Sequence, residues 1–140
     1  MIIVNCKFNK KAKELYKSVN VKIKELERFT NFILNEYKGT RNIWNYDLEI
    51  RIIDCDTSGY YFGCNEMEIG TKTSKRSIAK KKEWYLSSYF HELCHFAQDN
   101  LDKVKDSKQM QMQQIVLTNI IKTLWKYKQE SLKINILKST

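Results

Sequence analysis

The feature that most restricts the fold of this chain is a stretch of helical apolar spacing that contains both of its histidines. Between residues 84 and 101 large apolar side chains recur at helical spacing, at Trp84, Leu86, Tyr89, Phe90, Leu93, Ala97 and Leu101. His91 and His95 lie inside this stretch, four positions apart. Side chains four residues apart project from one face of a helix, about 6 Å apart along its axis. The sequence therefore predicts a helix that carries two imidazoles side by side.

The segments before this helix begin with a strand pattern followed by a helix pattern. Residues 1–8 (MIIVNCKF) are typical of a strand, and Asn9 is suited to cap a helix that starts after it. Residues 10–37 keep helical apolar spacing, with lysines and glutamates between the apolar positions. They predict a single long amphipathic helix that ends near Gly39.

Strands are expected in the middle of the chain. Leu48, Ile50 and Ile52 alternate with neighbours on the opposite face, which is the period of a strand. After turns rich in glycine and serine, a further strand is expected across Glu66 to Thr71. These segments predict a small mixed or antiparallel sheet.

A last helix is expected from about Ser107 to Gln129, opened by Asp106 and Gln109 as a capping box. The side of this helix that we expect to be buried carries apolar residues, namely Met112, Ile115, Val116, Ile120, Leu124 and Tyr127. The whole chain, residues 1–140, is then predicted as one α+β domain. It would contain a long backing helix, a small sheet, the histidine helix and a C-terminal helix.

The composition restricts the cellular compartment in which this domain is expected. No apolar run approaches the roughly 20 residues that cross a bilayer. The first residues lack the order of charges and the length of an export signal, and the four cysteines form no C-x-x-C pair. We therefore expect a cytoplasmic protein with free thiols. Its oligomeric state does not follow from the sequence.

The segment His91-Glu92-Leu93-Cys94-His95 has the residue types of a hydrolytic metal centre. Two neutral imidazoles on one helical face suit zinc. Glu92 is rotated about 100° from His91, where a carboxylate can reach a water beside the ion and accept its proton. The H-E-x-x-H spacing on a helix is the motif of zinc metallopeptidases. Two histidines that only pack on a shared helix face are the alternative interpretation.

The segment YFHELCHFAQ (residues 89–98) resembles the active-site helix of the zincin metallopeptidases. Across roughly residues 45 to 100 the chain resembles the small intracellular zincins, such as the Spartan/SprT-like and ImmA/IrrE-like groups. The resemblance implies a zincin-like fold and an endopeptidase activity. It also implies Zn²⁺ held by His91 and His95, and Glu92 as general base and acid. A peptide or protein substrate would lie extended along the strand at Glu66 to Thr71.

The third zinc ligand is the point where the chain departs from that family. Gluzincins take a glutamate from the next helix, and the matching segment here, KQMQMQQIVLT, has no carboxylate. Asp102 shares the helical face of the histidines and is ranked first, although it lies about 10 Å beyond His95 unless the chain turns back. Gln113 or Gln114 would lie opposite His95 in a helical hairpin, but a neutral amide binds zinc weakly. Cys64 is a further candidate.

A basic segment precedes the histidine helix and suggests an anionic partner. Its cations are Lys72, Lys75, Arg76, Lys80, Lys81 and Lys82. Cations near a helix N-terminus oppose the helix dipole, so a bound phosphate would relieve the conflict. A solvated basic surface is the simpler interpretation. A second hypothesis is therefore a nucleic-acid-associated or regulatory binding protein on a degenerate zincin scaffold.

Overall fold

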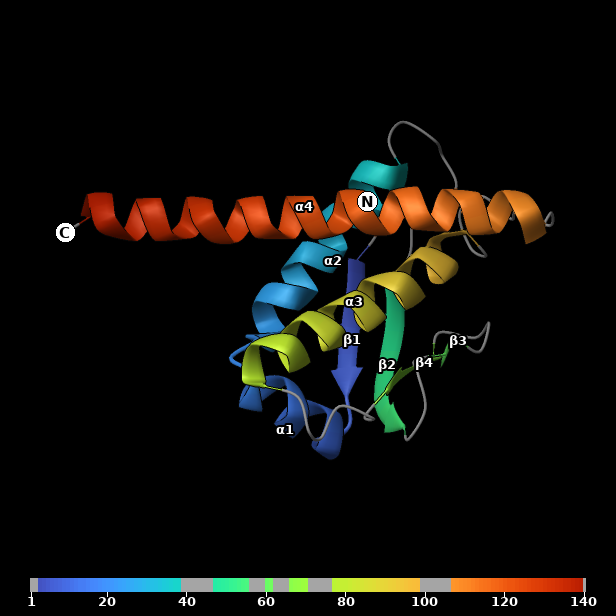
Figure 1. The fold of residues 1–140 in the computed structure, drawn as a ribbon, viewed down its shortest axis with the longest axis horizontal. Coiled ribbons are helices and arrows are strands. Elements are labelled where there is room, and N and C mark those ends of the chain that lie inside the picture. Colours follow the sequence, from blue (N-terminus) through green and yellow to red (C-terminus); the bar gives the residue numbers. More distant parts are fainter. Residues whose placement is uncertain are drawn as a thin grey trace.

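The computed structural model describes residues 3–38, 47–55, 60–61, 66–70, 77–98 and 107–139, and within these ranges four strands form one mixed sheet (Figure 1). The strand order is β1-β2-β4-β3. Strands β1 (Ile3–Phe8), β2 (Asp47–Cys55) and β4 (Glu66–Gly70) run parallel, and the short β3 (Tyr60–Tyr61) pairs antiparallel with β4. The α+β class and the mixed sheet agree with the sequence prediction.

One face of the sheet carries the apolar side chains that alternate along the strands. Ile50 and Ile52 of β2 are buried, and so are Met67 and Ile69 of β4. The register places Ile52 beside Met67, so the two strands present these residues on the same face. Arg51, between the two isoleucines, is exposed. The predicted strand alternation is therefore confirmed in β2 and β4.

The predicted single helix over residues 10–37 is wrong, because two helices occupy this range. Helix α1 (Lys10–Ser18) begins after Asn9, whose side chain accepts a hydrogen bond from the Ala12 amide, as the capping prediction required. Helix α2 (Ile23–Lys38) follows a break in which Asn20 has a φ of 60°. That left-handed conformation ends a helix, and asparagine accepts it more readily than most residues. The apolar period continues across the break, which is why spacing alone did not reveal it.

Helix α2 binds the outer edge of the sheet through polar side chains. The Asn31 side chain donates a hydrogen bond to the Val4 carbonyl at 2.8 Å and accepts one from the Val4 amide. The Cys6 amide donates to Glu27 Oε2 at 2.8 Å. These contacts satisfy backbone groups of β1 that would otherwise form an open sheet edge.

Helix α3 (Ile78–Ala97) contains the histidine pair and is capped by Ser77, whose side chain accepts from the Lys80 amide. Its apolar side covers the sheet and the neighbouring helices with fully buried aromatic rings, at Tyr89, Phe90 and Phe96. The Tyr16 hydroxyl donates to the Tyr85 carbonyl at 3.0 Å and ties α1 to this helix. The predicted histidine helix is confirmed, and its apolar side is packed against the sheet and the neighbouring helices.

Helix α4 (Ser107–Ser139) begins where the capping box predicted and packs chiefly on α3. It lies across one end of the sheet, and its C-terminal end projects beyond the other elements (Figure 1).

The prediction of which face of α4 is buried is wrong. The buried residues are Gln114, Thr118, Ile121 and Trp125, whereas the predicted set, from Met112 to Tyr127, is exposed. Within the described ranges, no helix is both long and apolar enough to cross a membrane.

Candidate metal centre

His91 and His95 lie side by side on the last two turns of α3, as their spacing predicted. Their ring centroids are 5.0 Å apart and the ring planes are nearly perpendicular. The residues between and after them, Leu93, Cys94 and Phe96, are buried, so the helix cannot rotate without exposing its apolar side. The packing of α3 therefore keeps both imidazoles on the side that faces α4.

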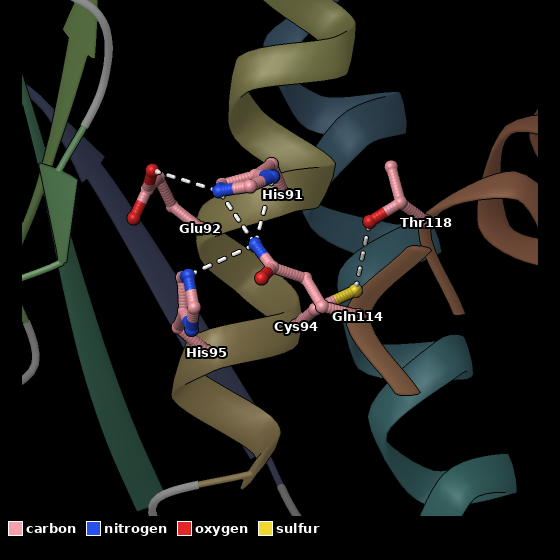
Figure 2. A network of polar contacts seen from close by, with 6 residues as sticks. All are labelled: His91, Glu92, Cys94, His95, Gln114 and Thr118. Carbon is pink, nitrogen blue, oxygen red and sulfur yellow. Dashed lines mark hydrogen bonds and ion pairs between the residues drawn. The ribbon is translucent and has the colours of Figure 1, made fainter. Parts of the chain in front are cut away.

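Gln114 of α4 reaches between the two imidazoles (Figure 2). Its side chain is on the buried face of α4, and the residue is 7% exposed. The amide nitrogen Nε2 lies 2.8 Å from His91 Nδ1 and 2.9 Å from His95 Nε2, and it also contacts His91 Nε2. Nitrogens of both rings are thus within hydrogen-bond distance of one point. Such convergence of electron-pair donors fits a metal ion as well as an amide.

Glu92 lies beside His91, and its carboxylate and the Gln114 amide both approach the Nε2 atom of His91 (Figure 2). The residue is 4% exposed, and its Oε1 is 3.9 Å from His91 Nε2. Burial raises the pKa of the Glu92 carboxyl from 4.5 to about 7. A carboxyl with such a pKa can accept and release a proton near neutral pH.

Both imidazoles are favoured in their neutral form. The partial burial of His91, whose side chain is 49% exposed, lowers its pKa, and the charges of His95 and Lys122 lower it further. Burial also lowers the pKa of His95. A neutral imidazole keeps the lone pair that binds a metal ion, so the surroundings favour the ligand form of both rings.

A second contact between the two helices fixes the register that brings Gln114 to the histidines. Thr118 Oγ1 lies 3.5 Å from Cys94 Sγ, one turn further along α4 (Figure 2). Burial raises the pKa of the Cys94 thiol to about 11, so this thiol stays protonated and does not act as a thiolate ligand at neutral pH. The Cys94–Thr118 contact therefore supports the site without belonging to its donor set.

The sequence candidates for a third ligand have different outcomes in the structure. Asp102 and Cys64 lie outside the described residues, so their predictions are unchanged. Gln113 accepts a hydrogen bond from Gln98 Nε2 at 3.4 Å, and its neighbour Gln114 contacts the histidines. Within the described part of the chain, no three His, Cys, Asp or Glu side chains come together as a metal site. A metal site with three protein ligands from the described residues therefore has to include a ligand other than His, Cys, Asp or Glu.

The sequence did contain a signal for Gln114. Gln114, Thr118, Ile121 and Trp125 follow one another at intervals of four, three and four, which defines one helix face. The apolar stripe from Met112 to Tyr127 is longer and more hydrophobic, so it dominated the prediction. Half of the residues on the buried face are polar, so periodicity does not identify this face, although Gln114 is one of the two glutamines that the sequence places opposite His95 in a helical hairpin.

The strand expected to receive a substrate has a partner along part of its outer edge. Tyr60 of β3 pairs with Glu68 of β4, and Tyr61 pairs with Met67. In the described sheet the outer strand beside β4 is therefore β3. A substrate strand that added to this side would meet β3 over that part of β4.

The described part of the basic segment lies on the first turns of α3. Lys82 lines a hollow of about 380 Å³ between α3 and α4, together with Lys122, Lys126 and Trp125. Lys72, Lys75 and Arg76 lie outside the described residues. Lysines from two helices, together with Glu83, thus line a hollow that begins one turn before His91, at Ser87.

Comparison with known proteins finds no family, no curated protein and no solved structure that matches this chain. Its function is therefore proposed from the geometry and chemistry of its own residues, together with the sequence resemblance to zincins.

Proposed function

We propose that the protein is a zinc-dependent hydrolase of peptide bonds, with His91 and His95 as metal ligands and Glu92 as general base and acid. The observation that carries the proposal is the convergence of nitrogens from both rings on one point, with a buried carboxyl 3.9 Å from His91. The converging ring nitrogens would bind the metal ion, and the carboxyl would transfer protons during hydrolysis. Zinc, when bound, polarises a water and a substrate carbonyl.

Glu92 has the position and the environment for two proton transfers. It would first take a proton from the attacking water and then give it to the amine that leaves the cleaved peptide. Its burial removes competing solvent, and its pKa of about 7 keeps both forms accessible at neutral pH. His91 and His95 remain neutral ligands through both transfers because their surroundings lower the pKa of each.

The proposed substrate is an extended peptide that lies beside the sheet. The resemblance to zincins supports this choice, because in that family a strand near the motif helix pairs with the substrate backbone. Since β3 covers part of β4, we propose that the substrate meets the sheet on the β3 side. Backbone pairing of this kind gives little sequence selectivity, so side-chain preferences would come from the surroundings of the site.

The test is cleavage of a quenched fluorescent peptide library by the zinc-supplemented protein and its Glu92→Gln variant. Removal of a general base lowers a rate by about 100-fold or more. We expect Glu92→Gln to lose cleavage to that extent while it retains zinc. Glu83→Gln, an exposed position on the same helix, is the matched control and should cleave as the wild type does. Equal cleavage by Glu92→Gln would contradict the mechanism.

A second candidate function is binding of an anionic partner such as a nucleic acid. It is supported by three lysines that line one hollow, Lys82 on α3 and Lys122 and Lys126 on α4, against one carboxylate, Glu83. Binding to single-stranded DNA would weaken steeply with salt. It would survive Glu92→Gln and fall when Lys80, Lys81 and Lys82 are changed to alanine. The same number of charges removed at Lys10, Lys13 and Lys17 on α1 is the control, and equal losses would indicate only unspecific attraction.

A further inference from the structure

The amide group of Gln114 has more contacts with ring nitrogens than it can satisfy. Its Nε2 lies within hydrogen-bond distance of Nδ1 and Nε2 of His91 and of Nε2 of His95. A primary amide nitrogen has two hydrogens to donate, and a neutral imidazole has only one nitrogen that accepts. The amide can therefore donate to one nitrogen of each ring, and its contact with the second His91 nitrogen is not a hydrogen bond.

Rotation of the amide by 180° exchanges its nitrogen and its oxygen with almost no change in shape. The oxygen then points between the rings, where it meets the accepting nitrogens of His91 and His95. Three electron-pair donors around one point repel one another unless a cation lies between them. The nitrogen-inward orientation forms hydrogen bonds within the protein, whereas the oxygen-inward orientation brings together three electron-pair donors that a metal ion can bind.

We propose that Gln114 is the third protein ligand of the metal centre and binds the ion through Oε1. This inference rests on the proposed function, because it adds a donor to the site that His91 and His95 define. It gives the centre three neutral ligands, so the ion keeps its full charge. A glutamate at the same place would neutralise half of that charge and bind zinc more tightly, since carboxylates are better zinc ligands than amides.

The fold supports this role for Gln114 over its neighbours on α4. The contact between Cys94 and Thr118 holds α4 in register, and Trp125, further along the same face, packs against Phe29 and Phe90. Gln113 contacts Gln98. Gln114 is buried, and glutamine is rarely buried unless its amide group has polar partners.

The experiment measures zinc affinity by competition with a chromogenic chelator, with folding checked by circular dichroism. We expect Gln114→Ala to weaken zinc binding by about tenfold or more and Gln114→Glu to strengthen it by about tenfold or more. Gln113→Ala is the matched control, and its affinity should stay within about twofold of the wild type. Gln114→Glu keeps the size of the side chain, so it tests the ligand even where the alanine variant loses stability.

The outcomes separate this inference from the proposed function. If His91→Ala and His95→Ala lose zinc while Gln114→Ala binds it as the wild type does, Gln114 is not a ligand and the histidine centre stands. An affinity of Gln114→Glu equal to or below that of the wild type also overturns the inference. If the wild type binds no zinc, the inference and the proposed function both fail.

Discussion

At the scale of single residues, the carboxyl of Glu92 is an ionisable group of the candidate site that lies almost entirely out of contact with water. Its pKa rises from 4.5 to about 7 because burial disfavours the charged form. A folded protein that raises a carboxyl pKa loses stability when that carboxyl ionises. Glu92 therefore costs stability at neutral pH in the metal-free protein, which is common for groups that serve chemistry.

The pH dependence of stability follows from this carboxyl in metal-free protein. The unfolded chain releases the Glu92 proton near pH 4.5 and the folded chain near pH 7, so stability falls as pH rises across this window. We expect Glu92→Gln to be as stable as the wild type near pH 4.5 and more stable at pH 8. The gain is at most about 3 kcal/mol, because each pKa unit is worth about 1.4 kcal/mol.

Urea unfolding with a chelator present, at several pH values, measures this difference. The variant Glu83→Gln, on an exposed position of the same helix, should show no comparable pH-dependent gain. A Glu92→Gln variant that is less stable than the wild type at pH 8 would mean that the carboxylate has a stabilising partner. The burial argument for its pKa would then be wrong.

At the scale of elements, periodicity predicted which segments are helices and strands. It did not predict where a helix breaks or which face of a helix is buried. Residues 10–37 keep their apolar period through the break at Asn20, so the pattern looks continuous. In α4 the exposed stripe is more apolar than the buried face. Which face is buried depends on the neighbours of α4, namely two imidazoles and a thiol beside Gln114 and Thr118 and aromatic rings beside Trp125, and this information lies elsewhere in the chain.

The break between α1 and α2 should depend on the backbone conformation of Asn20. Its φ of 60° costs most residues about 1 kcal/mol, whereas glycine adopts it freely. We expect Asn20→Gly to leave the free energy of unfolding nearly unchanged and Asn20→Ala to lower it by about 1 kcal/mol. Chemical denaturation measures both. An alanine variant at least as stable as the glycine variant would indicate that one helix continues through this position.

The orientation of α4 can be tested with two neighbouring isoleucines. Ile121 is 6% exposed and Ile120 is 48% exposed. We expect Ile121→Ala to cost about 2–4 kcal/mol of unfolding free energy through lost packing. The matched variant Ile120→Ala should change it by about 0.5 kcal/mol or less. The reverse order, measured by urea unfolding, would place α4 with its apolar stripe inward, as the sequence alone suggested.

At the scale of the whole molecule, the candidate site joins two helices that are separate in sequence. His91, Glu92 and His95 lie within one helical turn and a half, so local geometry was enough to predict them. Gln114 reaches them only because α4 packs on α3, and 23 positions separate it from His91. A side chain contributed through tertiary packing cannot be ranked from spacing, which is why Asp102 was preferred on the sequence.

The most direct test of the central claim is the zinc content of the purified protein after zinc supplementation and dialysis. Elemental analysis should find one zinc per chain in the wild type and in Glu92→Gln, because the glutamate is not a ligand in this account. It should find almost none when His91 and His95 are both changed to alanine. A wild type without zinc, or a double variant that holds as much zinc as the wild type, would contradict a metal centre at this site.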